Sequence, residues 1–140
     1  MKYAKKSLGQ NFLKDKNIIN KILNQRDICA KNIIEIGPGQ GALTDCILKK
    51  KPKSLILIEK DNNLYEDLKL KYKNNKKIKI FNDDILKFNL EKVAKKNSII
   101  FGNLPFNISS QILVKIIKFK KWPPNYVAII LMFQKEMADR

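Results

Sequence analysis

The sequence predicts an α/β fold in which helices cover both faces of a parallel sheet. Five short apolar stretches alternate along the chain with segments whose apolar residues recur every three or four positions. Strands that alternate with helices in this way form doubly wound parallel sheets with right-handed crossovers. A glycine-rich turn, 37–41, directly follows the first apolar stretch, where such sheets bind ligands. The length of 140 residues allows one domain, 1–140.

The first half of the chain predicts an arm, three helices and three strands. Residues 1–13 lack periodicity and form the N-terminal arm. Asp15 is placed to cap a helix over 16–25 because its carboxylate can accept from the first free N–H groups. The second helix, over 42–50, is expected to end at a run of lysines, 49–51, that is followed by Pro52. The expected elements after the first helix are strand Ile33–Ile36, a helix over 42–50, strand Ser54–Glu59, a helix capped by Asp61 that runs to about Tyr72, and a strand over 77–82.

The second half predicts a short helix over 90–96, a strand over Ser98–Phe101, a helix capped by Ser109 or Ser110, and a fifth strand over Val127–Phe133. The last strand is apolar throughout, which is typical of a strand inside a sheet. With nothing beside it, its free edge would favour aggregation. We therefore expect a sheet that is truncated after about the fifth strand.

The composition excludes several classes of function. The chain has no histidine, which excludes Ser-His-Asp and Cys-His catalysis and histidine metal ligands. Cys29 and Cys46 stand alone, without a CxxC pair, and fit reduced thiols in the cytosol better than a metal site or a disulfide. No apolar run reaches the roughly 18 residues of a membrane helix. We expect a cytoplasmic protein that binds neither a metal nor a membrane.

The charge permits a polyanionic partner without identifying one. Lys and Arg number 29 against 13 Asp and Glu, a formal net charge of +16. Lys, Ile and Asn all have A/T-rich codons, so a solvated lysine surface set by genome composition explains the bias as well as nucleic-acid binding does. Whatever its origin, this charge attracts polyanions in a salt-dependent way.

The glycine turn and a following carboxylate form the first candidate site. Alternate glycines, Gly37, Gly39 and Gly41, let the backbone turn sharply and approach a ligand closely. The pattern is GxGxG rather than the GxGxxG of dinucleotide sites. Glu59 ends the second strand, where an acidic side chain can accept both hydroxyls of a ribose. A plain turn and a surface carboxylate beside Lys60 are the alternatives.

Two further motifs follow the third and fourth strands. In Asp83-Asp84-Ile85, a carboxylate can accept from an adenine amino group, or the aspartates can simply form a turn. Asn103-Leu104-Pro105-Phe106 offers an amide oxygen, a carbonyl oriented by proline and a flat ring. Two acceptors and a stacking ring suit the exocyclic amine of a planar base, whose lone pair is freed when both hydrogens are accepted. The alternative is a proline turn with a core phenylalanine.

These motifs, taken together and in order, resemble the ribosomal RNA adenine N6-dimethyltransferase family, which uses S-adenosylmethionine. The resemblance spans the whole chain and favours the branch that modifies small-subunit RNA. It implies a Rossmann-like methyltransferase sheet and a catalytic domain that lacks the family's C-terminal helical domain. The segments that carry it are Lys6–Leu13 (KSLGQNFL), Glu35–Thr44 (EIGPGQGALT), Glu59, Asp84, Asn103–Ser109 (NLPFNIS) and Gln134–Glu136.

The resemblance also implies roles for single residues. The residues implied to bind the cofactor are Asn11 and Leu13 from the arm, Glu35, Gly37 and Gly39 at its methionine part, Glu59 at the ribose, and Asp84 and Ile85 at the adenine. Asn103 and Leu104 would take the target amine, Pro105 would orient the loop, and Phe106 would stack on the flipped base. The resemblance also implies that Asn103 contacts the cofactor.

The family dimethylates two adjacent adenines of small-subunit (16S-type) ribosomal RNA within a precursor of the small subunit, and we expect a monomer. One alternative is a non-catalytic RNA-binding assembly factor or an inactive fragment that keeps the motifs. A nicotinamide-dependent oxidoreductase could share the fold and Glu59, but GxGxG and NLPF argue against it. DNA amino methyltransferases use an Asn/Asp-Pro-Pro-aromatic motif, from which Leu104 departs.

Overall fold

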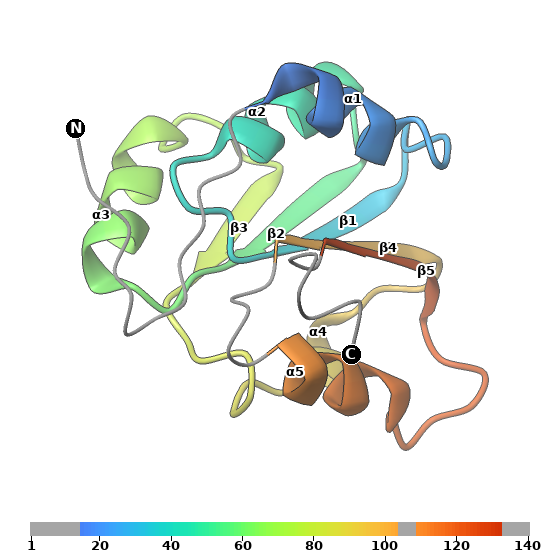
Figure 1. The fold of residues 1–140 in the computed structure, drawn as a ribbon. Coiled ribbons are helices and arrows are strands. Elements are labelled where there is room, and N and C mark those ends of the chain that lie inside the picture. The colour runs from blue at the N-terminus through green and yellow to red at the C-terminus, as the bar shows by residue number, and fades with distance from the viewer. Residues whose placement is uncertain (1–14, 104–108, 133–140) are drawn as a thin grey trace.

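The computed structural model describes residues 15–103 and 109–132 and contains the predicted alternation of helices and strands (Figure 1). The elements are α1 (Lys16–Leu23), β1 (Asn32–Ile36), α2 (Ala42–Lys49), β2 (Ser54–Ile58), α3 (Asn62–Lys71), β3 (Ile78–Phe81), α4 (Leu90–Val93), β4 (Ser98–Asn103), α5 (Ser109–Ile117) and β5 (Tyr126–Met132). Several boundaries differ from expectation by one to three residues; among them, β2 ends at Ile58, one residue before Glu59, and α4 ends at Val93 rather than at residue 96. Helix α1 ends at Leu23 rather than at residue 25, and strand β4 continues to Asn103.

Helix starts follow the local chemistry of the sequence. Asp15 caps α1, where its Oδ1 accepts from the backbone N–H of Asn17 at 2.9 Å. Asp61 caps α3, where its Oδ1 accepts from the N–H of Leu64 at 2.9 Å. These two predicted caps are confirmed, whereas Ser109 and Ser110, one of which was predicted to cap the next helix, lie within α5 itself.

All strand pairs are parallel, in the order β3-β2-β1-β4-β5. The direction of winding reverses between β1 and β4, so the connections that follow these two strands run to opposite faces of the sheet. Such a reversal opens a crevice at the carboxyl ends of the strands, where doubly wound folds bind ligands.

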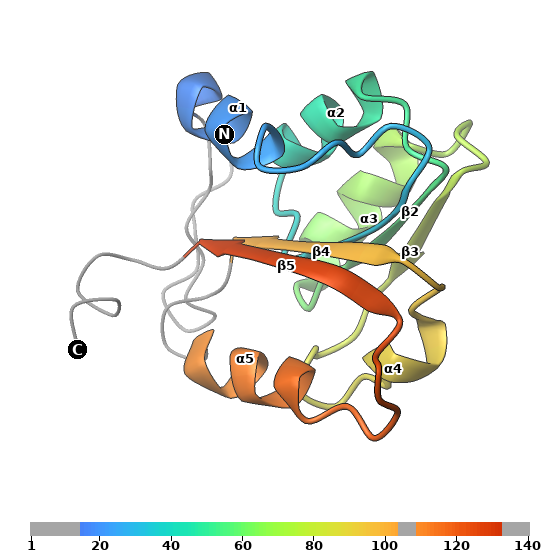
Figure 2. The same cartoon turned by 90° about the vertical axis from the view of Figure 1, so that its right-hand side faces the viewer.

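Helices cover both faces of the sheet (Figure 2). Helices α1, α2 and α3 lie on one face, and α4 and α5 lie on the other. Because successive side chains of a strand point to opposite faces, each central strand contributes to two separate cores. Ile33 and Phe101 belong to the first core, with Leu23, Ile47 and Leu68 from the helices. The second core contains Ile34, Ile36, Ile56, Ile58, Ile100, Leu90, Ile112 and Ile116. The doubly wound architecture is confirmed.

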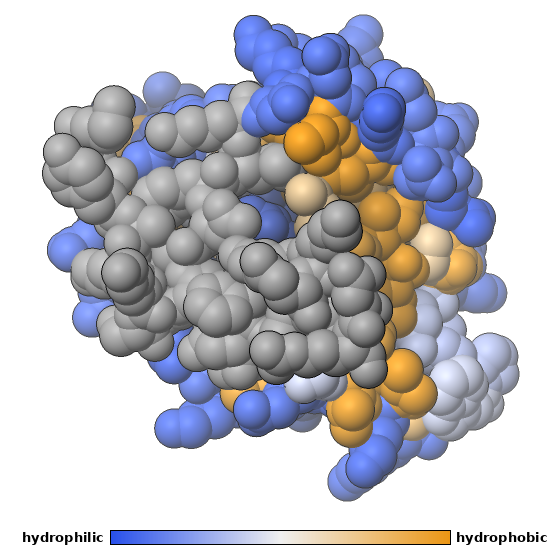
Figure 3. Space-filling view, in the orientation of Figure 1, coloured by the Kyte–Doolittle hydropathy of each residue, from blue (hydrophilic) through white to orange (hydrophobic). Residues whose placement is uncertain are grey.

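Strand β5 has a different environment from the central strands. Among the described residues it pairs with β4 alone, and Val127 is 45% exposed. Figure 3 shows apolar side chains gathered in a band on this side of the molecule, with hydrophilic residues beside it.

No helix in the described part of the chain is long and apolar enough to cross a membrane.

Candidate functional site

The candidate site lies at the carboxyl edge of the sheet, where the ends of four strands meet. The register pairs Ile36 at the end of β1 with Ile58 of β2 on one side and Gly102 of β4 on the other. Ile58 in turn pairs with Phe81 at the end of β3. The glycine turn, Glu59, Asp84 and Asn103 therefore follow neighbouring strand ends, as the sequence predicts.

The three glycines adopt a backbone that other residues rarely adopt. Their φ angles are 69° at Gly37, 60° at Gly39 and 92° at Gly41. A Cβ at Gly37 would lie 3.2 Å from the backbone oxygen of Asn103, closer than most side-chain contacts. The first glycine thus lets the loop after β1 approach the end of β4. This close approach brings the glycine turn and the Asn103 motif together.

Glu59 connects the glycine turn to the next helix. Its Oε1 accepts from the N–H of Gly39 at 3.1 Å, and its Oε2 accepts from the N–H of Asp61 at 2.9 Å. The side chain is only 6% exposed, and burial raises the pKa of its carboxyl. The sequence predicted that the carboxylate of Glu59 accepts hydrogen bonds from the two hydroxyls of a ribose. The structure adds that both oxygens already accept a backbone N–H, which fixes the carboxylate in place, and each oxygen keeps a second lone pair.

Glu35 is a second buried carboxyl, on β1 itself. Thr44 of α2 donates its hydroxyl to Glu35 Oε1 at 2.6 Å. Burial raises the pKa of Glu35 to about 8, and the nearby charges of Glu59 and Asp45 add to this effect. Such a group is protonated at neutral pH unless a cation comes close. A positively charged ligand that binds beside Glu35 would therefore favour the deprotonated form of its carboxyl.

The turn after β3 distinguishes its two aspartates. Asp84 is half-buried and its Oδ1 accepts from the N–H of Leu86 at 3.0 Å, whereas Asp83 is exposed. Lys60 Nζ lies 3.5 Å from Asp84 Oδ2. The Ile85 side chain is buried in the second core, so only its backbone is available to a ligand. Asp84 is the aspartate of the pair that faces inward.

A brace that sequence reasoning missed holds the third glycine. Tyr72, at the end of α3, donates its hydroxyl to Asp45 Oδ1 at 2.7 Å, and its oxygen lies 3.4 Å from the carbonyl of Gly41. Lys71 Nζ pairs with Asp45 Oδ2 at 2.7 Å and reaches the carbonyl of Gln40 at 3.3 Å. A Cβ at Gly41 would lie 2.5 Å from the Tyr72 hydroxyl. Leu64, Leu68 and Tyr72 recur every four residues, a spacing that is typical of one helix face and does not reveal this polar contact.

Five predicted site residues lie outside the described residues: Asn11, Leu13, Leu104, Pro105 and Phe106. Asn103, the first residue of the NLPF motif, is described. It is half-buried at the end of β4, where it pairs in register with Met132 of β5.

The groups that meet at this edge are mostly hydrogen-bond acceptors. Carboxylates follow β2 and β3, Glu35 lies within β1, and the Asn103 backbone carbonyl faces the first glycine. In the described part of the chain, no group of three or more Cys, Asp or Glu side chains is arranged to hold a metal ion. The arrangement suits an organic ligand that carries hydroxyl, amino or cationic groups, since these donate to or attract the acceptors.

Comparison with known proteins relates the chain to enzymes that modify ribosomal RNA. The model of the family "Ribosomal RNA adenine dimethylase" matches residues 1–140. The ribosomal RNA small subunit methyltransferase A of Pelagibacter ubique is 49% identical over 143 residues, covering 98% of this chain and 52% of that protein. The enzyme of the same name from Mycoplasmopsis synoviae is 46% identical over 139 residues, covering 99% and 52%. The chain thus spans about half the length of the curated relatives it matches.

Solved structures show the same fold. A dimethyladenosine transferase from Plasmodium falciparum superposes with a TM-score of 0.76 at 30% identity, covering 93% of this chain and 46% of that one. The 23S rRNA methyltransferase ErmE superposes with a TM-score of 0.76 at 25% identity, covering 91% and 50%. The Rossmann-like methyltransferase sheet implied by the sequence resemblance is confirmed.

Proposed function

Because the chain belongs to the ribosomal RNA adenine dimethylase family, we propose that it is the methyl-transferring part of an enzyme that dimethylates the N6 amines of two adjacent adenines in small-subunit ribosomal RNA. The observation that carries this proposal is the contact between the two motifs. A Cβ at Gly37 would lie 3.2 Å from the Asn103 backbone oxygen, so the glycine turn and the NLPF motif are neighbours, and a methyl donor held by one would lie near an amine held by the other.

The acceptor-rich edge fits S-adenosylmethionine, which when bound supplies an electrophilic methyl group on a cationic sulfur. Glu35, Gly37 and Gly39 would hold its methionine part. Glu59, fixed by the N–H groups of Gly39 and Asp61, would accept from the ribose hydroxyls through its remaining lone pairs. In the same proposal Asp84 accepts from the adenine amino group and the backbone of Ile85 contacts the ring.

The residues of the NLPF motif would prepare the target amine. The amide oxygen of Asn103 and the carbonyl of Leu104 would accept hydrogen bonds from its two N–H groups, so that the nitrogen becomes pyramidal and its lone pair is directed at the methyl group. As the N–C bond forms, the C–S bond breaks, and the methylated nitrogen then releases one proton to water. Pro105 holds the loop and Phe106 stacks on the flipped base. No histidine base is needed before attack, and orientation contributes most of the rate. Asn11 and Leu13 would close over the cofactor from the N-terminal arm.

The proposed substrate is ribosomal RNA within a precursor of the small ribosomal subunit, with the protein acting as a monomer in the cytoplasm. The names of the relatives, which span about twice the length of the chain, support the small-subunit ribosomal RNA substrate. The alternative, an assembly factor that binds RNA without methylating it, shares every residue of the site and differs only in turnover.

Methyl transfer to small ribosomal subunits that lack adenine dimethylation tests the proposal. The 140-residue chain and S-adenosylmethionine are incubated with these subunits, and the digested nucleosides are analysed by mass spectrometry. Dimethyladenosine that forms with the wild type and disappears with Asn103→Ala supports the proposed reaction. RNA binding without any methylated product would contradict it and favour the assembly factor.

A further inference from the structure

We propose that the amino edge of the sheet, opposite the candidate site, binds the phosphate backbone of RNA. The amino edge is defined here as the five connections that enter the strands: 24–31, 50–53, 72–77, 94–97 and 118–125. Because all five strands are parallel, these connections lie at one end of the sheet. The identification of the polyanion as RNA rests on the proposed function.

The charge of this edge is almost entirely positive. Its five connections contain 13 Lys and Arg residues and one acidic residue, Asp27. All 13 cationic side chains are exposed. The described connections at the carboxyl edge, 37–41, 59–61 and 82–89, contain two lysines and four acidic residues. A/T-rich codons would enrich lysine at both edges equally, so genome composition does not explain this separation.

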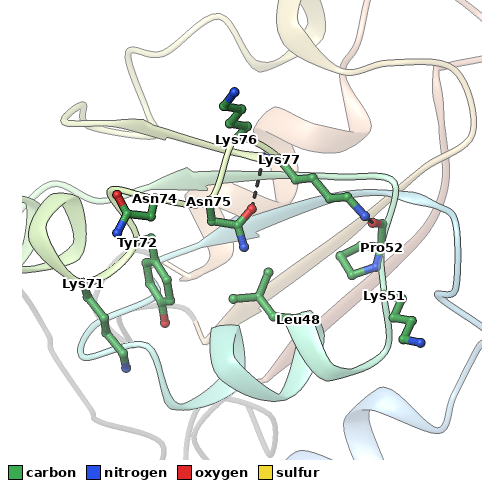
Figure 4. A pocket seen from close by; sticks show the side chains of 9 residues that line it. All are labelled: Leu48, Lys51, Pro52, Lys71, Tyr72, Asn74, Asn75, Lys76 and Lys77. Carbon is green, nitrogen blue, oxygen red and sulfur yellow. Dashed lines mark hydrogen bonds between the residues drawn. The ribbon is translucent and has the colours of Figure 1, made fainter.

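The edge is hollowed in two places where lysines from different connections come together. A hollow of about 630 Å³ between the turns before β2 and β3 is lined by Lys51, Lys76 and Lys77 and by no acidic side chain (Figure 4). Asn74 and Asn75 supply amides in the same wall. A second hollow of about 360 Å³ opens beside the connection before β5. Lys118 and Lys120 of that connection line it together with Lys115 of α5, Lys87 of the connection after β3 and one acidic side chain, Glu91. A polyanion that follows the edge would pass both hollows.

An exposed aromatic residue distinguishes a nucleic acid from other polyanions. Trp122 follows Lys120 and Lys121 in the connection before β5 and is 63% exposed. Basic side chains beside an exposed ring form a surface on which a backbone is neutralised and a base stacks. The combination fits a single-stranded or looped RNA segment better than it fits inorganic polyphosphate.

Trp122 is also the only tryptophan in the sequence, so fluorescence reports directly on this edge. The probe is an oligouridylate of about twelve nucleotides, which has no adenine and so offers the candidate site no target amine. The tested variant is Lys53→Glu/Lys96→Glu, which changes the connections before β2 and β4. Both side chains are exposed. The matched control, Lys16→Glu/Lys69→Glu, makes the same change of charge on helices α1 and α3.

We expect oligouridylate to change the Trp122 fluorescence of the wild-type chain. In the edge variant the Kd should rise at least tenfold. The slope of log K against log salt should become less negative by about 1.4, or about 0.7 for each lost phosphate contact. The control variant should keep its Kd within about twofold. If circular dichroism shows that the edge variant is unfolded, Lys76→Glu/Lys95→Glu takes its place.

Any one of four results would overturn the proposal. These are an equal rise in Kd in the edge and control variants, unchanged Trp122 fluorescence on addition of oligouridylate, a fluorescence response to polyphosphate equal to the response to oligouridylate, and binding to phosphatidylserine vesicles without binding to RNA. The proposed methyl transfer fails separately. Absence of dimethyladenosine alongside normal oligouridylate binding counts against that reaction alone, whereas normal methylation without oligouridylate binding counts against the amino edge alone.

Discussion

At the carboxyl edge of the sheet Glu35, Glu59 and Asp61 are at most 6% exposed, and each is hydrogen-bonded, whereas the 13 cationic side chains of the amino edge are all exposed. The difference is one of preorganisation. Buried groups with fixed partners can orient a small ligand, and each is hard to replace. Many mobile surface charges attract a long polyanion, and each contributes little. We therefore expect single substitutions to have large effects at one edge and small effects at the other.

The largest expected effect is on methyl transfer by Asn103→Ala. Loss of a preorganised acceptor should lower the rate by about 10²-fold or more while S-adenosylmethionine still binds. Single-turnover assays with undermethylated subunits measure the rate, and calorimetry measures cofactor binding. Near-normal turnover would show that the amine is not held at the end of β4.

Glu59→Ala should weaken S-adenosylmethionine binding by about 1–3 kcal/mol, because hydrogen bonds to a buried charged group are lost. The substitution also leaves the N–H groups of Gly39 and Asp61 without their acceptor. Glu59→Gln serves as the control, since its one amide oxygen retains part of the pattern. Equal calorimetric affinities of wild type and Glu59→Ala would contradict the assignment.

Glu35 should make the stability of the ligand-free chain depend on pH. Its pKa rises from the usual 4.5 to about 8 on burial, so between these values the folded state holds a proton that the unfolded state has lost. The free energy of unfolding should therefore fall as the pH rises through this window, by at most about 1.4 kcal/mol per pH unit. Urea denaturation at pH 6 and pH 8 measures this change. Glu35→Gln should flatten the dependence, and an equally steep profile in that variant would exclude Glu35 as its source.

Tyr72→Phe should have a smaller effect, of about 1 kcal/mol in unfolding free energy, because it removes one hydroxyl that donates to Asp45. It should also relieve part of the clash expected in Gly41→Ala, whose new Cβ would lie 2.5 Å from that hydroxyl. A double-mutant cycle on thermal unfolding measures this coupling. Strict additivity of the two substitutions would show that the brace does not hold the glycine turn.

The smallest expected effects belong to the amino edge. Lys76→Ala removes one exposed charge and should change the unfolding free energy by no more than about 0.5 kcal/mol. Chemical denaturation is sufficient to check this, with Lys69→Ala on α3 as the control. A loss of several kcal/mol would mean that this edge, like the carboxyl edge, depends on individually fixed charges.

Local signals predicted most of the fold correctly. The caps at Asp15 and Asp61, the buried strands and the glycine turn all depend on residues close together in the chain, and all are confirmed. The strand order is a different matter, because it depends on contacts between distant segments. The sequence predicted a doubly wound parallel sheet, but the order of its strands came from the structure.

The candidate site was predictable in its residues more than in its contacts. The spacing of Gly39 and Glu59 indicated a shared ligand, but not that the two residues hydrogen-bond to each other. The spacing of Tyr72 is typical of an apolar helix face. Its hydroxyl contacts Asp45 because α3 ends beside the start of α2. Hydrogen bonds of this kind depend on the path of the backbone, which residue patterns do not specify.

The strand order also has a consequence for how the chain folds. Residue 33 pairs with residue 55 of β2 and, on its other side, with residue 99 of β4. Closing the longer loop costs more chain entropy, so we expect β1, β2 and β3 to associate before β4 docks. During synthesis from the N-terminus, the glycine turn, Glu59 and Asp84 would then be assembled before Asn103 reaches them. The docking of β4 onto β1 is thus the event that joins the two halves of the proposed reaction.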